Sequence, residues 1–278
     1  MEGKILQKIN KLNLKKGNDC KMKNETIDTQ TNSKEMLESE EKQLSSKKEK
    51  AKNLKPFAKK SNLEEIALAK RLIAEFLGTY FLVFAGTGGL ILDHITGDLG
   101  HFGTSLVFGL ALMIVIFTFS HLSGAHVNPA ISLAFLIQGK INVISTITYM
   151  IAQILGAITA SWTLYMMFGQ VAKLGATLPV GTGTQTFVLE AILTFFLTLI
   201  ILSSVYGNQG KPYTGIAAGS VLFFAMFFAA PLTGASLNPA RSIGPALISG
   251  ATEGLEIYII AAFTGAIIAA FISKFINE

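Results

Sequence analysis

The tripeptide Asn-Pro-Ala occurs twice in this chain, and its residue types are suited to presenting hydrogen-bond donors at a helix start. Asparagine is a strong N-cap and proline is preset for the first helical position, so each copy predicts the beginning of a helix. A helix start offers unpaired N–H groups and about half a positive charge. The asparagine amide adds a further donor. The two copies are Asn128-Pro129-Ala130 and Asn238-Pro239-Ala240.

Three ionisable residues lie in or beside apolar segments and are further candidates for a functional role. Glu75 and Glu190 lie inside such segments, where an ionisable residue is a functional candidate by default. They could couple a proton, or they could act as structural braces that accept N–H groups from the loops before the two tripeptides. Their equivalent placement favours bracing. Arg241 directly follows the second tripeptide, and outside the N-terminal segment it is the only base without a loop or span-end position.

No combination of side chains suggests catalysis or metal binding. The four histidines and the single cysteine have no metal-ligand spacing. No nucleophile stands in a recognisable pattern with a base. We therefore expect no metal, no cofactor and no enzymatic activity.

The elements that must position these residues are predicted to be membrane helices. Half of the residues are hydrophobic, 15% are charged and the mean hydropathy is +0.49. A helix needs about 20 apolar residues to cross a bilayer. Two shorter apolar runs, 129–137 and 239–248, follow the tripeptides and predict re-entrant half-helices. The segments long enough to span lie near 68–92, 103–122, 142–168, 186–206, 213–231 and 255–276. The predicted fold is an all-α membrane protein with six transmembrane helices and two half-helices.

The chain contains an internal repeat, with halves at about 66–168 and 186–276. Glu, Thr, Phe and Leu coincide when 75–82 is aligned with 190–197. Three spans per half is an odd number, so the second half must be inverted. The half-helices then enter from opposite faces, and their N-termini meet near the midplane as a positive focus that disfavours cations. A water that accepts hydrogen bonds from both asparagines would turn its own hydrogens outward and interrupt a proton wire.

The N-terminal segment differs in composition from the rest of the chain. Residues 1–60 hold 16 of the 23 Lys and Arg and 9 of the 18 Asp and Glu, a net charge of about +7. We predict a disordered, lysine-rich tail over 1–62 and a channel domain over 63–278. A basic amphipathic helix lying on anionic lipid is a less favoured alternative for the tail. The basic character belongs to the tail, and we expect no nucleic-acid partner.

The loop charges predict the orientation of the chain in the bilayer. The tail and a set of basic residues gather at one set of span ends, and the opposite loops are mainly acidic. By the positive-inside rule we expect both termini to be cytoplasmic; which membrane holds the protein is open. The basic residues are Lys70, Arg71, Lys140, Lys211 and Lys274.

Over residues 66–276 the chain resembles the aquaporin family, the major intrinsic proteins. The resemblance lies in Ser-Gly-Ala-His-Val-Asn-Pro-Ala at 123–130 and Thr-Gly-Ala-Ser-Leu-Asn-Pro-Ala-Arg-Ser at 233–242. It implies passive water conduction with exclusion of protons and ions, bracing by the two glutamates, and homotetramers with one pore per subunit. Pore size, lining donors, an arginine and half-helix dipoles are the established basis of selectivity in such pores.

The resemblance also implies an aromatic/arginine constriction, formed here by Phe108, Met226, Ala235 and Arg241. Water channels usually have His at the position of Met226, so this chain is more similar to archaeal water channels and plant nodulin-like proteins. Glycerol facilitators typically have Asp where this chain has Ser242. We expect water as the main solute, with small neutral solutes such as glycerol as further candidates. A glycerol facilitator with little selectivity for water and a proton-coupled secondary transporter are the alternatives.

Overall fold

A computed structural model describes residue 42, residues 45–46, and residues 67–206 and 211–277. Apart from residues 42, 45 and 46, the predicted tail over 1–62 lies outside the described residues. All regular structure within the described ranges is helical, and no strand occurs there. This confirms the all-α prediction.

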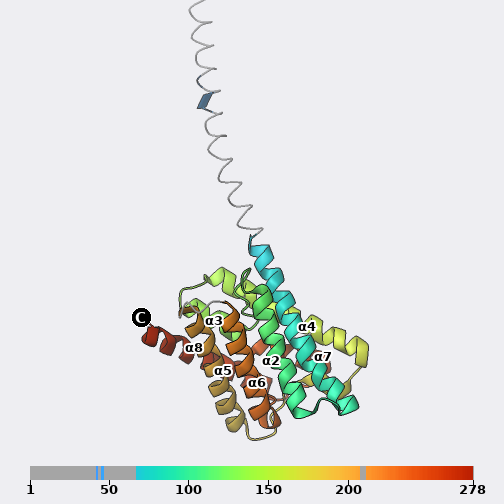
Figure 1. Cartoon of the computed structure of the whole chain (residues 1–278). Helices are drawn as coiled ribbons and strands as arrows, with labels where there is room; N and C mark the ends of the chain where they lie inside the picture. Colours follow the sequence, from blue (N-terminus) through green and yellow to red (C-terminus); the bar gives the residue numbers. More distant parts are fainter. Residues whose placement is uncertain (1–41, 43–44, 47–66, 207–210, 278) are drawn as a thin grey trace, which may run out of the picture. The chain divides into compact units, whose positions relative to one another are not determined.

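The helices follow the same order in both halves of the chain: long, long, short, long (Figure 1). The first half contains the helix Ala67–Thr96, α2 (Gly100–Phe119), α3 (Pro129–Ile137) and α4 (Val143–Phe168). The short 3-10 element η1 (Val171–Gly175) follows α4. The second half contains α5 (Gly183–Tyr206), α6 (Lys211–Thr233), α7 (Pro239–Ser249) and α8 (Leu255–Asn277).

Six of these helices are long and apolar enough to cross a membrane within the described residues. They correspond to the six predicted spans, and α3 and α7 correspond to the two predicted half-helices. The largest difference is in the first half, where the first helix continues to Thr96 and α2 covers residues 100–119 instead of 103–122. The cause is local: Asp93 Oδ1 accepts a hydrogen bond of 2.7 Å from Gly100 N, which fixes an earlier start for α2.

Each half contains an equivalent close contact between two of its long helices. Gly156 on α4 lies against the backbone carbonyl of Phe76, and Gly265 on α8 lies against that of Ala191 on α5. A Cβ at either glycine would collide with backbone atoms, so no other residue fits without a shift of the helices. The two glycines therefore allow close approach of the packed helices at equivalent places in the two halves.

The interior of the bundle contains both polar and apolar side chains, whereas large apolar side chains are exposed on its outer surface. Large hydrophobic side chains on the long helices face outward, including Ile144, Met166 and Phe275, which are 69%, 68% and 86% exposed. A surface of this kind suits contact with lipid tails. Inside, α3 and α7 pack against α4 and α8. The two half-helices therefore lie within the bundle, where their N-terminal ends carry the asparagines.

Candidate functional site

Each Asn-Pro-Ala segment starts a short helix. Asn128 has an extended backbone and its Oδ1 accepts a hydrogen bond of 2.9 Å from Ala130 N. Asn238 has the same conformation and accepts from Ala240 N at 3.0 Å and Arg241 N at 3.4 Å. These bonds satisfy N–H groups that the first helical turn leaves without partners. The predicted helix starts are confirmed.

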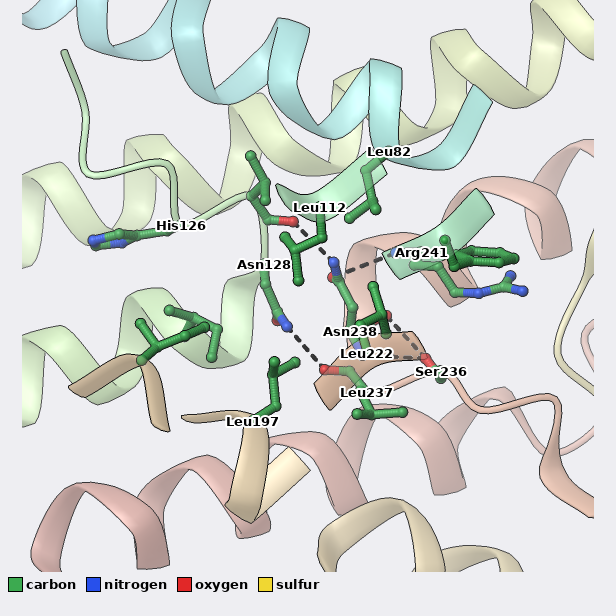
Figure 2. Close-up of a pocket in the computed structure, with 14 residues that line it drawn as sticks. Leu82, Leu112, His126, Asn128, Leu197, Leu222, Ser236, Leu237, Asn238 and Arg241 are labelled. Atoms are coloured by element: carbon green, nitrogen blue, oxygen red, sulfur yellow. Dashed lines mark hydrogen bonds between the residues drawn. The ribbon is translucent and has the colours of Figure 1, made fainter. Parts of the chain in front are cut away.

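Backbone carbonyls of the opposite half hold the two asparagines. Asn128 Nδ2 donates to Leu237 O and Asn238 Nδ2 donates to Val127 O, both at 2.8 Å (Figure 2). A primary amide carries two N–H donors. Each asparagine therefore retains one N–H that this pairing does not use, and the two half-helix starts are locked face to face.

The accepting carbonyls belong to residues with a left-handed backbone. Val127 has φ 44° and Leu237 has φ 54°, and two positions earlier Ala125 and Ala235 have φ 51° and 45°. For residues other than glycine this conformation costs about 1–2 kcal/mol each. Such strain persists where the surroundings over-determine it, commonly at functional sites. Here the same strained pattern precedes both half-helices.

Glu75 fixes the loop before α3. Its Oε1 accepts from Ser123 Oγ at 2.5 Å and from His126 N at 3.0 Å, and its Oε2 accepts from Val127 N at 2.7 Å. Gln153 Nε2 on α4 donates to Oε2 at 2.8 Å. The carboxyl group is fully buried, and both of its oxygens are occupied by protein donors.

Glu190 makes the equivalent contacts before α7. It accepts from Thr233 Oγ1 at 2.7 Å, from Ser236 N at 2.9 Å and from Leu237 N at 2.9 Å. It is also fully buried. These are the contacts that a structural brace requires, and they are the same in type as those of Glu75.

Two tyrosines that the sequence analysis did not identify as site residues complete the bracing. Tyr149 Oη donates to Ser123 O at 3.1 Å and Tyr258 Oη donates to Thr233 O at 2.6 Å. Both rings are buried. A signal was present, because each tyrosine lies seven residues before the close-packed glycine of its helix, Gly156 or Gly265.

Arg241 is buried beside Phe108. Its Cζ lies 5.0 Å from the centroid of the Phe108 ring, and its Nη1 donates to Gly175 O at 2.8 Å. Its Nε has no hydrogen-bond partner within the described part of the chain. Gly175 ends η1, in which Ala172 and two further residues have left-handed backbones. A loop from outside the repeat thus fixes the guanidinium.

One cavity brings many of the predicted residues together. Figure 2 shows Asn128 and Asn238 near its middle, with His126 toward one end and Arg241 toward the other. Phe108 also lines it. Leucine, valine and isoleucine side chains supply most of the remaining wall, for example Leu82, Leu112, Ile131, Leu197, Leu222 and Leu237. A polar row therefore crosses an otherwise apolar cavity.

The other predicted residues lie next to this cavity. Met226 on α6 and Ala235 are buried in the apolar cluster that contains Phe108, and neither is among the residues that line the cavity. Glu75 and Glu190 do not line it either.

A second cavity continues from the His126 end of the first. His126, Ile131 and Ile201 line both, and Ser120 and Thr214 contribute hydroxyl groups to the second. The His126 ring stacks on Phe135 at 4.3 Å. The two cavities therefore adjoin at His126, on one side of the asparagines.

A row of hydroxyl groups supports the second half-helix. Thr177 Oγ1 lies 2.7 Å from Ser242 Oγ, which lies 2.5 Å from Ser236 Oγ. Ser236 Oγ donates to Asn238 O at 3.0 Å. Ser242 thus connects the loop after η1 to the cap residue of α7.

No cluster of three or more potential metal ligands occurs within the described ranges. The polar side chains that line the two cavities carry amide, hydroxyl, imidazole and guanidinium groups, and the rest of the wall is mainly apolar. Such a site can form hydrogen bonds with small neutral molecules and repel cations.

Comparison with known proteins identifies related sequences and a related structure. Residues 62–273 match the family model described as Major intrinsic protein. The chain is 39% identical to Nodulin-26 of Glycine max over 219 residues, which cover 78% of this chain and 81% of that protein. It is 38% identical to Aquaporin NIP1-1 of Zea mays, over 74% of each protein.

Among solved structures, the chain is similar to the aquaglyceroporin from Plasmodium falciparum. The TM-score is 0.69 and the sequence identity is 27%. The match covers 75% of this chain and 97% of the solved chain. The similarity therefore includes almost the whole of the solved channel.

Proposed function

The chain belongs to the major intrinsic protein family. From this premise we propose that its two adjoining cavities form a passive pore for water and small neutral solutes. Members of this family are channels and not enzymes. The chain is therefore a multi-pass membrane channel for water and small solutes, in agreement with its six apolar helices. The names of its relatives, which include an aquaporin and an aquaglyceroporin, support water and glycerol as solutes.

The observation that carries this proposal is the reciprocal pairing of Asn128 and Asn238 in the wall of the pore. Each amide retains one N–H, and the half-helix starts add positive potential from two directions. A water molecule that accepts from both amides has both lone pairs occupied, so it donates its hydrogens to its two neighbours along the pore and accepts from neither of them. Proton transfer along the water file is then interrupted, while water itself passes.

Selectivity is assigned to Phe108, Met226, Ala235 and Arg241. Arg241 supplies a fixed positive charge and rigid donors for passing oxygens. The Phe108 ring at 5.0 Å limits the width on one side of the guanidinium. Met226 and Ala235 lie in the same apolar cluster as Phe108 without lining the cavity, and we propose that they set the remaining width through their packing against its wall. The apolar Met226 favours passage of glycerol in addition to water.

The contacts of the two glutamates favour a channel over a proton-coupled transporter. A transporter that couples a proton through Glu75 or Glu190 needs that carboxyl group to be accessible from the pore. Glu75 and Glu190 are fully buried, are occupied by loop donors and do not line the pore. They are better suited to hold the two half-helix loops.

We propose that residues 63–278 form the channel domain, that residues 1–62 form a cytoplasmic tail, and that both termini are cytoplasmic. The charge pattern of the loops supports this orientation. We further propose a homotetramer with one pore per subunit, supported by the family and by the exposed apolar side chains of the long helices. Chemical cross-linking in lipid would test the subunit number.

The proposed pore can be tested with purified protein in liposomes. Vesicles are challenged in parallel with an impermeant osmolyte and with glycerol, and their volume is followed by light scattering. A passive pore accelerates shrinkage in the first case and re-swelling in the second, without saturation and without a proton gradient. A glycerol flux that saturates, or that requires a proton gradient, would instead support a coupled transporter.

A further inference from the structure

Helix α6 contains a proline, and a residue on a neighbouring helix lies within hydrogen-bond distance of the carbonyl that the proline leaves without its regular donor. Pro231 lies inside α6 and has no N–H. In a regular α-helix that N–H would bond to the carbonyl four residues earlier, which belongs to Phe227. The proline therefore removes the regular intrahelical donor of the Phe227 carbonyl.

His101 on α2 is within hydrogen-bond distance of this carbonyl. Its Nε2 lies 2.7 Å from Phe227 O. Because a carbonyl can only accept, the histidine must donate, as the Nε2–H tautomer or as the imidazolium. The His101 ring also stacks on the Phe227 ring, with centroids 5.1 Å apart and an interplanar angle of 17°. The two contacts fix both the donor and the plane of the ring.

The contact joins the two helices that carry the proposed constriction. Helices α2 and α6 pack side by side (Figure 1). Phe108 lies seven residues after His101 on α2, which is about two helical turns. Met226 directly precedes Phe227 on α6. A displacement of α6 at Phe227 would therefore move Met226 relative to Phe108.

We propose that His101 is a positioning residue for the constriction, which ties the first turn of α2 to α6 by donating to the carbonyl that Pro231 leaves without its regular donor. This inference rests on the proposed function, because it gives Phe108 and Met226 the role of limiting the pore. Without the bond, α6 is less firmly held at Phe227, and the pore beside Met226 widens. The ratio of glycerol to water permeability should then rise.

A double-mutant cycle separates this role from general stability. His101→Phe retains a ring that can stack on Phe227 but has no donor, and His101→Gln retains an N–H donor without the ring. Pro231→Ala returns the N–H of α6 to the Phe227 carbonyl, so the donor on His101 is no longer needed. Each variant is measured in proteoliposomes for water and glycerol permeability.

We expect His101→Phe to raise the glycerol-to-water ratio by about two- to tenfold, the range equivalent to one net hydrogen bond. The same change in the Pro231→Ala background should alter the ratio by less than about twofold. His101→Gln should remain close to the unmodified protein. An unchanged ratio in His101→Phe, or an equal change in both backgrounds, would overturn the inference.

Met226→Ala serves as the control for the constriction itself. If Met226→Ala raises the glycerol-to-water ratio and His101→Phe does not, the pore assignment stands and the role of His101 is wrong. If Met226→Ala has no effect, the constriction assignment fails. Thermal unfolding in detergent then tests the bond alone, with the unmodified protein, His101→Phe, Pro231→Ala and the double variant. His101→Phe must lower the midpoint of unfolding more when Pro231 is present. Equal shifts in both backgrounds would refute the bond.

Discussion

Replacement of Arg241 by valine should convert a selective pore into one that leaks cations. Arg241 is the only fixed positive side chain that lines the described pore. Its Cζ lies 5.0 Å from the Phe108 ring centroid, a contact distance that leaves no space between the two groups. A solute therefore passes beside the guanidinium, at about 5 Å from its charge. Valine keeps an apolar wall but removes both the charge and the hydrogen bond to Gly175 O.

The size of the effect follows from the distance. Two unit charges about 5 Å apart in a medium with an effective dielectric constant of about 20 repel each other by about 3 kcal/mol. That energy corresponds to roughly a hundredfold lower entry of a monovalent cation. Arg241→Val should therefore raise cation and proton conductance by roughly a hundredfold per channel, less any exclusion still provided by the half-helix dipoles.

The assay combines two measurements on the same vesicles. Proton flux is followed with a trapped pH-sensitive dye under a potassium diffusion potential, and water flux is followed by light scattering. Arg241→Lys is the matched control, because it retains a positive charge and should keep cation conductance low. Conductance in Arg241→Val that equals that of the unmodified protein, with water flux intact, would refute the assignment of exclusion to this side chain.

Three further substitutions test other parts of the structure. Phe108→Ala should widen the pore and raise glycerol permeability at least about twofold. Phe271 is exposed on the outer surface, so Phe271→Ala should leave glycerol permeability unchanged, and equal rates of swelling in the two variants would contradict the role of Phe108 in the constriction. Glu190→Gln places an amide N–H group against backbone N–H donors and should lower the free energy of unfolding by about 1–3 kcal/mol, while the exposed Glu256→Gln should change it little in denaturant titrations. Tyr258→Phe removes a donor to a backbone carbonyl and should cost about 1 kcal/mol in the same titrations, so a neutral result would show that this bond does not contribute.

The fold was largely predictable because its signals are local. Apolar length predicts the membrane helices, and the Asn-Pro pairs predict the starts of α3 and α7. The start of α2 was less predictable, since it depends on a single hydrogen bond between Asp93 and Gly100. Such a bond cannot be identified before the loop conformation is known.

The site was predictable only in part, because several of its contacts join distant or irregular segments. The sequence contains both asparagines, but their bonds to Val127 O and Leu237 O depend on left-handed backbones at alanine, valine and leucine, residue types that rarely adopt them. The contact of Arg241 with Gly175 depends on a loop that has no counterpart in the repeat.

The contact between His101 and the carbonyl that Pro231 leaves without its regular donor could not be predicted from the sequence either. The proline itself marks an irregular point in α6. Nothing in the spacing of the chain shows which neighbouring helix would supply the missing donor. That information requires the packing of α2 against α6.

The central claim is that the path past Asn128 and Asn238 conducts water passively, and osmotic shrinkage of proteoliposomes tests it most directly. Vesicles that contain the full chain, and vesicles that contain a chain lacking residues 1–60, are compared with protein-free vesicles after addition of an impermeant osmolyte. We predict that at least the truncated chain shrinks its vesicles faster than protein-free vesicles, at a rate independent of any proton gradient. Shrinkage of both preparations at the protein-free rate would contradict the account.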